Sequence, residues 1–172
     1  QLLENFAQRI LVRSRITPDS ATRFLQVESV AERPPLSLHI ATVDLVVCVH
    51  NPLDAGQQCL ESVIQHSTPP YSVILVDDGS EDPTRDYLLD FAARYTAILI
   101  RNDMARGYGF AANQGLRASQ ADYVFLLNSD TIVTAEWLDR LLACGESDSR
   151  IGLIGPLSNT ASWQSIPDLE QN

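Results

Sequence analysis

Tyr123-Val124-Phe125-Leu126-Leu127-Asn128-Ser129-Asp130-Thr131 is the stretch that decides the fold. Its first five residues form a short apolar run of the kind that makes a buried strand, and polar residues follow at once. A carboxylate at the point where such a strand leaves the core can hold a divalent metal against a phosphate. A second acidic pair, Asp77-Asp78, follows an equivalent run, Val73–Val76. Two acidic strand ends in one pattern indicate a nucleotide-diphosphate site.

Strands and helices alternate from about Val43 onward. We expect strands over 45–49, 73–76, 97–100, 123–127 and 151–154, and helices over 54–66, 83–95, 110–119 and 135–144. This alternation implies βαβ units and an α/β fold, a Rossmann-like, mostly parallel sheet flanked by helices. Ligands of such sheets bind beyond the carboxyl ends of the strands. The candidates there are His50-Asn51, Asp77-Asp78, Arg101-Asn102 and Asn128–Asp130.

The first 36 residues differ from the rest. Apolar residues recur there at helical spacing: Leu2, Leu3, Phe6, Ile10 and Leu11. Thr17-Pro18-Asp19 marks a break before a second helix, and Pro34-Pro35 ends the segment. We therefore expect a helical lead-in over 1–36 and the domain that carries the nucleotide-diphosphate site over 37–172. Because the chain opens on Gln1 rather than methionine, we expect it to be a piece of a longer, multidomain protein.

Composition excludes several classes of function. The chain has 172 residues, 45% of them hydrophobic and 20% charged, as in an ordinary soluble protein. Its net charge is −10, which disfavours a nucleic-acid binder because such a protein needs a basic face. No apolar run approaches the roughly 18–20 residues of a membrane helix, and no secretory signal is visible. Cys48, Cys59 and Cys144 lack metal-ligand spacing, so we expect buried thiols in a reducing cytoplasm.

The turn Asp77-Asp78-Gly79-Ser80 combines structural and functional signals. Asp82, or Ser80, can cap the helix that follows. Capping does not explain two adjacent carboxylates, one of which should face the cleft. Asp78, and after it Asp77, is the candidate acceptor for a base N–H or a ribose hydroxyl.

The other candidates are distributed over the later strand ends and loops. Asp130 has the oxygen ligands that Mg²⁺ or Mn²⁺ prefers, whereas the neutral Asn128 suits a ribose hydroxyl. His50 can stack on a base or hydrogen-bond to it. Arg106 either faces the nucleotide or is a solvated loop arginine, and Asn113 can tie its helix to the strand-end loops.

Taken in order, these motifs resemble the inverting, GT-A-fold glycosyltransferases of family 2. The resemblance covers roughly residues 43–160 and rests on four stretches: Val46–Asn51, Val76–Ser80, Asn102–Gly115 and Leu126–Thr131. Gly155-Pro156-Leu157-Ser158-Asn159 also looks like the rhamnosyltransferase-like members. The resemblance implies a nucleotide-sugar donor, UDP- or dTDP-linked, a glycan acceptor and a divalent cation.

By the same resemblance, His50 and Asn51 lie at the nucleotide edge and Asp78 binds the base. Asn128 and Asp130 occupy the outer positions of the metal-binding triplet, with Asp130 the principal carboxylate. Family members take their general base from a later acidic segment, and neither Asp168 nor Glu170 lies in a recognisable base motif. We therefore expect the base beyond Asn172, so that this piece holds mainly the donor site.

Three alternatives share some of these features. A degenerate module would bind nucleotide sugars without transferring them. A phospho-acceptor receiver domain has a similar sheet but uses a lysine, and all twelve basic residues here are arginine. A sugar nucleotidyltransferase has a glycine-rich, arginine-lysine loop after its first strand, where this chain has His50-Asn51-Pro52-Leu53-Asp54. The last two are therefore minor.

Overall fold

A six-stranded sheet organises the chain in the computed structural model, which describes residues 10–13 and 41–156. The strand order is β4-β3-β2-β5-β1-β6. Four strands run parallel: β2 (Val43–Val49), β3 (Ser72–Asp77), β4 (Ile98–Arg101) and β5 (Tyr123–Asn128). β1 (Ile10–Arg13) pairs antiparallel with β5 and with β6 (Leu153–Ile154). The predicted α/β class and mostly parallel sheet are confirmed.

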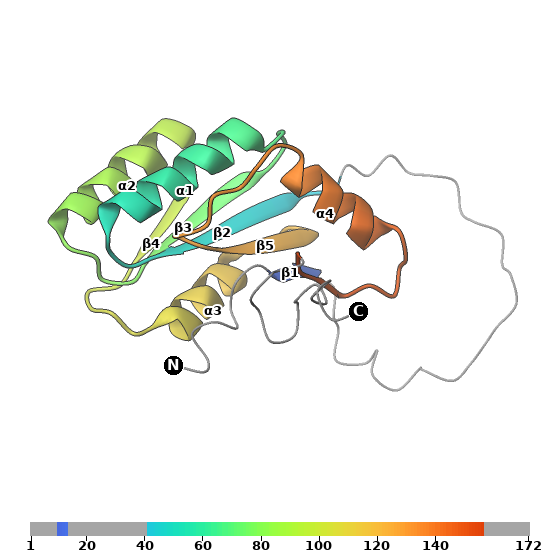
Figure 1. The fold of residues 1–172 in the computed structure, drawn as a ribbon. Coiled ribbons are helices and arrows are strands. Elements are labelled where there is room, and N and C mark those ends of the chain that lie inside the picture. The colour runs from blue at the N-terminus through green and yellow to red at the C-terminus, as the bar shows by residue number, and fades with distance from the viewer. Residues whose placement is uncertain (1–9, 14–40, 157–172) are drawn as a thin grey trace, which may run out of the picture.

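In the described part of the chain, four helices cover the two faces of the sheet (Figure 1). α1 (Leu53–His66), α2 (Asp82–Tyr95) and α4 (Trp137–Glu146) lie on one face, and α3 (Tyr108–Ala118) lies on the other. Each of the four helices predicted after residue 43 is present, with ends that shift by up to two residues. Among the described residues, no helix is long and apolar enough to cross a membrane.

Alternate side chains of each parallel strand enter two separate cores. In β2, Leu45 and Val47 belong to the core under α1, α2 and α4, whereas Val46 and Cys48 belong to the core under α3. Because both faces are covered, these strands are nearly continuous apolar runs. The same alternation decides which polar residue at a strand end faces which layer.

The prediction of a helix through Ile10 and Leu11 is wrong, because Ile10–Arg13 form strand β1. Periodicity cannot separate a helix from a strand in so short an apolar run, and pairing with β5 decides for the strand. The rest of the predicted lead-in over 1–36, and its boundary at 36/37, lie outside the described residues.

α3 approaches the sheet closely at Gly115. A Cβ on this glycine would lie 2.2 Å from Cγ1 of Val46 and 3.2 Å from Cγ2 of Val76. Val46 is completely buried and its side chain is β-branched, so it cannot move aside without disturbing the core. The missing side chain at residue 115 therefore sets the separation between α3 and strands β2 and β3.

We expect Gly115→Ala to lower the free energy of unfolding by about 1–3 kcal/mol, as overpacking of a core does. Gly109→Ala is the matched control, because it adds the same methyl group to α3 at a position with nothing within 4 Å. The control should be neutral or slightly stabilising, since alanine favours the helix. Urea unfolding followed by circular dichroism measures both, and equal stabilities would contradict this account.

Candidate functional site

A cavity of about 380 Å³ opens at the carboxyl ends of the parallel strands. It lies where the chain order of the strands reverses around β2, the place at which α/β sheets bind ligands. Five of the seven residues predicted for the site line it: His50, Asn51, Asp78, Asn128 and Asp130. The two that do not line it are Asp77 and Arg106.

Strand pleating explains why Asp78 faces this cavity and Asp77 does not. Successive side chains of a strand point to opposite faces. Val76 points to the α3 side and Leu75 to the other side, so Asp78 continues the first row and Asp77 the second. In register with them, Val49 pairs with Asp77 and Cys48 with Asn128. His50, Asp78 and Asn128 therefore gather on the α3 side.

The buried carboxylate of Asp78 holds the loop that leads into α3. Its Oδ1 accepts hydrogen bonds from Asn102 Nδ2 at 2.8 Å and from the Arg106 N–H at 3.0 Å. Its Oδ2 accepts from the same Arg106 N–H at 3.0 Å and from the Gly107 N–H at 2.7 Å. The carboxylate is thus the anchor of one cavity wall.

The hydrogen bonds to Asp78 also set its protonation state. Burial alone would raise the pKa of the carboxyl group. Hydrogen bonds from the Arg106 N–H, the Asn102 amide and the Gly107 N–H, together with the charge of His50, outweigh burial and hold the pKa below its ordinary value. Asp78 is therefore a carboxylate at neutral pH.

Gly79 brings the turn after β3 against the same loop. Its φ is +73°, a conformation that favours glycine, and a Cβ there would lie 2.6 Å from both the backbone N of Ala105 and the carbonyl carbon of Met104. Any side chain would push the loop away. Asp78 and Gly79 therefore hold the loop by hydrogen bonds and by contact respectively.

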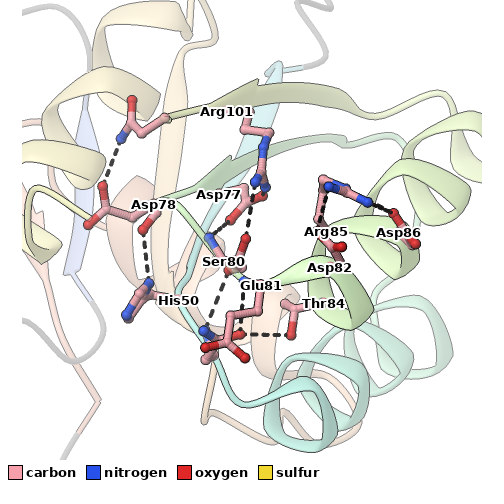
Figure 2. A network of polar contacts seen from close by, with 12 residues as sticks. His50, Asp77, Asp78, Ser80, Glu81, Asp82, Thr84, Arg85, Asp86 and Arg101 are labelled. Atoms are coloured by element: carbon pink, nitrogen blue, oxygen red, sulfur yellow. Dashed lines mark hydrogen bonds and ion pairs between the residues drawn. The ribbon is translucent and has the colours of Figure 1, made fainter. Parts of the chain in front are cut away.

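Asp77 has a structural role, which corrects its predicted place at the nucleotide. The residue is fully buried, and its Oδ2 forms an ion pair with Arg101 (Figure 2). Its Oδ1 accepts the Ser80 N–H at 2.8 Å, and Arg101 donates to the Ser80 carbonyl at 3.1 Å. Together Asp77 and Arg101 fix the turn between β3 and α2.

Asn51 lines the cavity but directs its side-chain oxygen at the start of α2. This Oδ1 accepts hydrogen bonds from the Thr84 hydroxyl at 3.1 Å and from the Glu81 N–H at 3.4 Å. The predicted caps, Asp82 and Ser80, are wrong: Glu81 is at the N-cap position and its side chain makes no cap hydrogen bond. The donor at the helix start is instead satisfied from the β2–α1 loop.

His50 is exposed at the cavity, and its ring is hydrogen-bonded to the main chain of Asp78. Nδ1 lies 2.9 Å from the Asp78 carbonyl oxygen (Figure 2). Because a carbonyl can only accept, Nδ1 carries the proton in this contact.

Asn128 and Asp130 form the opposite wall of the cavity. Asn128 Oδ1 is buried and is the one buried side-chain polar atom of the described residues without a hydrogen-bond partner. Asp130 is exposed. Among the described residues, no group of three or more histidines, cysteines or acids gathers that could alone enclose a metal. A cation here would take its remaining ligands from a bound diphosphate and water.

Arg106 does not line the cavity, and its side chain stacks on Phe110. Its guanidinium carbon lies 3.6 Å from the centre of the Phe110 ring, a cation–π contact at the start of α3. Asn113 bonds within α3, to the Gly109 carbonyl at 2.7 Å, and does not tie the helix to the strands. Gln114 does this, through two hydrogen bonds of 2.9 Å with Asn102.

Several cavity residues carried little polar signal in the sequence. Cys48, Ala105, Tyr108 and Ala111 all line the cavity. The alternation of side chains along β2 identifies Cys48, because residues two apart on a strand point to the same face and Cys48 therefore shares the face of His50. Burial raises the pKa of the Cys48 thiol to about 12, with a further contribution from Asp78, so this thiol is protonated and inert. Cys59 is buried as expected, whereas Cys144 is exposed, which corrects its predicted burial.

We expect Asp78→Asn to lower the free energy of unfolding at pH 7 by about 2–3 kcal/mol, because an amide cannot accept all these hydrogen bonds. The native pKa is depressed, so the stabilisation is present above the unfolded pKa of about 4 and is lost as pH falls through the native value. The difference in unfolding free energy between the wild type and Asp78→Asn should therefore be constant above about pH 5 and become smaller in acid.

Asp90→Asn is the control for charge, since Asp90 pairs with Arg94 on the exposed face of α2. Urea titrations across pH should show a change within about 0.5 kcal/mol for this variant. Equal effects of the two substitutions would contradict the role given to Asp78.

Known proteins resemble the chain over the part that contains this cavity. Curated relatives include a poly-beta-1,6-N-acetyl-D-glucosamine synthase of Staphylococcus epidermidis, 26% identical over 53% of this chain and 22% of the relative. Another is the glycosyltransferase AglE of Haloferax volcanii, 30% identical over 57% of this chain and 33% of the relative. The matches thus span a third or less of these relatives.

Solved structures share the fold. The mannosyltransferase PcManGT of Pyrobaculum calidifontis, in complex with GDP-Man and Mn²⁺, superposes with a TM-score of 0.60 at 21% identity, over 66% of this chain and 34% of that one. S. aureus TarS 1-349, in complex with UDP-GlcNAc, gives 0.56 at 20% identity, over 61% and 31%. The fold is that of GT-A enzymes. The family model "Glycosyl transferase family 2" matches residues 44–156, and the chain therefore belongs to glycosyltransferase family 2.

Proposed function

We propose that the chain carries the nucleotide-sugar-binding site of an inverting, metal-assisted glycosyltransferase that acts on a glycan. The observation that carries this proposal is the cavity at the strand switch point, with His50 and Asp78 on one wall and Asn128 and Asp130 on the other. An unpaired, buried Asn128 oxygen in such a cavity needs a donor, which a ribose hydroxyl would supply.

The two walls suit the two ends of a nucleoside diphosphate. When its ring is neutral, Nε2 of His50 would offer an acceptor to an N–H group of a base. Asp78 would support that wall, since both of its carboxylate oxygens already accept hydrogen bonds from the loop before α3. Asp130, on the far wall, would face the diphosphate. Asn51 and Asp77 enter this proposal as supports of the β2–α1 loop and the β3–α2 turn, since their side-chain oxygens are engaged there.

The residues present fit a hard divalent cation such as Mg²⁺ or Mn²⁺. Asp130 provides an accessible carboxylate, and these ions accept one or two protein carboxylates together with phosphate oxygens and water. When bound there, the cation would neutralise charge on the diphosphate leaving group. Asp130 would hold and orient that group, while Asn128 would hold the ribose.

The cavity offers no carboxylate for the general base. Of the acids that line it, Asp78 is occupied by the loop before α3 and Asp130 is assigned to the cation. We propose that the base lies outside the described cavity. The same observation favours the second candidate function, a module that binds nucleotide sugars without transferring them, and transfer by the parent protein would distinguish the two.

We propose that the nucleotide of the sugar donor is UDP, GDP or dTDP. The structures named above contain UDP-GlcNAc and GDP-Man, and the motif resemblance adds dTDP-linked donors. A rhamnosyltransferase-like specificity, which the stretch Gly155–Asn159 suggested, stays a prediction, as do the division of the chain at residue 36 and a cytoplasmic location.

We expect the 172-residue chain to bind UDP, GDP or dTDP, and Mn²⁺ to strengthen that binding. Asp130→Ala should weaken the Mn²⁺-dependent binding at least about tenfold, the lower end of the losses seen even when indirect supports of a metal are removed. Asp86→Ala is the control, an exposed aspartate on α2 that pairs with Arg85. Isothermal titration calorimetry measures all three proteins, and no metal-dependent binding of any of the nucleotides would refute the proposal.

A further inference from the structure

One turn of α1 contacts both ends of the segment that carries Asp130. Near the start of this segment, the Cys59 thiol donates a hydrogen bond to the Asn128 carbonyl at 3.4 Å. At its end, the Ser62 hydroxyl accepts the Val133 N–H at 3.0 Å. The same hydroxyl donates to the Cys59 carbonyl at 2.8 Å, so the two contacts are joined to each other. Figure 1 shows the segment between β5 and α4 running alongside α1.

The contacts are buried, whereas the residue they bracket is not. Cys59 and Ser62 are 0% and 6% exposed. Asp130 is exposed, and none of the described residues donates a hydrogen bond to its carboxylate. Within the bracketed segment the Thr131 N–H also donates to the Asn128 carbonyl, at 3.1 Å, which closes a turn around Ser129 and Asp130. The position of the Asp130 carboxylate therefore depends on its backbone.

We propose that Cys59 and Ser62 are positioning residues that clamp residues 128–133 and thereby set the affinity of Asp130 for a divalent cation with a nucleoside diphosphate. The inference rests on the proposed function of Asp130. Removing the Ser62 hydroxyl leaves the buried Val133 N–H without its acceptor, and the segment must move to satisfy it. Removing the Cys59 thiol frees the other end.

The test compares nucleotide binding with and without metal. UDP, GDP and dTDP are titrated into the 172-residue chain in the presence and absence of MnCl₂, and the quantity compared is the gain in affinity that Mn²⁺ provides. Ser62→Ala should reduce this gain about tenfold and leave metal-free affinity within about twofold, as for the loss of an indirect support of a metal. A loss of fold alone would lower both affinities together.

Two controls separate the clamp from a general loss of stability. Ser147→Ala removes a hydroxyl that makes the same bond three residues back, to the Cys144 carbonyl at 2.7 Å, but on the exposed end of α4. It should leave the gain unchanged. Cys59→Ala should reduce the gain, and Cys59→Ser should restore most of it, because a hydroxyl also donates. If Ser62→Ala does not fold, the Cys59 pair decides.

Amide hydrogen exchange tests the clamp without nucleotide, since the Val133 N–H should exchange faster in Ser62→Ala and at the wild-type rate in Ser147→Ala. If Ser62→Ala and Cys59→Ala both keep the wild-type gain in nucleotide affinity from Mn²⁺, the clamp proposal is overturned and the proposed function is not. Equal losses with and without Mn²⁺ also overturn it. A wild-type chain that binds no nucleotide, or gains nothing from Mn²⁺, overturns the proposed function as well, so the two failures are distinguishable.

Discussion

The Asp78 carboxylate is the interaction on which the cavity depends. It joins the end of β3 to Asn102 beyond β4 and to the two backbone N–H groups that precede α3. Its own backbone continues the connection, because the Asp78 N–H donates to Val49 at the end of β2 and its carbonyl accepts from His50. Three strand ends and one helix start thus meet at a single residue. The cavity is a hollow between parts that this residue holds in place.

The neighbouring acids Asp77 and Asp78 point to opposite faces of the sheet, because successive side chains of a strand alternate between the two faces. Asp77, on the side of α1 and α2, neutralises Arg101 and fixes the turn into α2. Asp78 performs the equivalent task on the α3 side. Asp77 is buried whereas Arg101 is partly exposed, so removing Arg101 would leave a buried carboxylate without its counter-charge, which is costly. Part of the support of the cavity therefore lies outside it, at Asp77 and Arg101.

Most of the fold follows from local pattern, and part of the site does not. Apolar runs and helix periodicity place every parallel strand, and the strand-end rule brings His50, Asn128 and Asp130 together. The pattern fails at Ile10–Arg13, where distant pairing with β5 decides the structure. It also cannot foresee that Asn51 serves α2 or that Arg106 stacks on Phe110, because these contacts depend on how two loops pack.

The antiparallel strand β1 has a consequence for the solubility of shorter versions of this polypeptide. β1 lies between β5 and β6 and pairs with both. The family match begins at residue 44, so a protein trimmed to the matched residues would lack β1. β5 would then present a free row of N–H and C=O groups, and such edges recruit strands from other molecules. Strand β1 thus covers an edge of β5 that would otherwise be open to pairing between molecules.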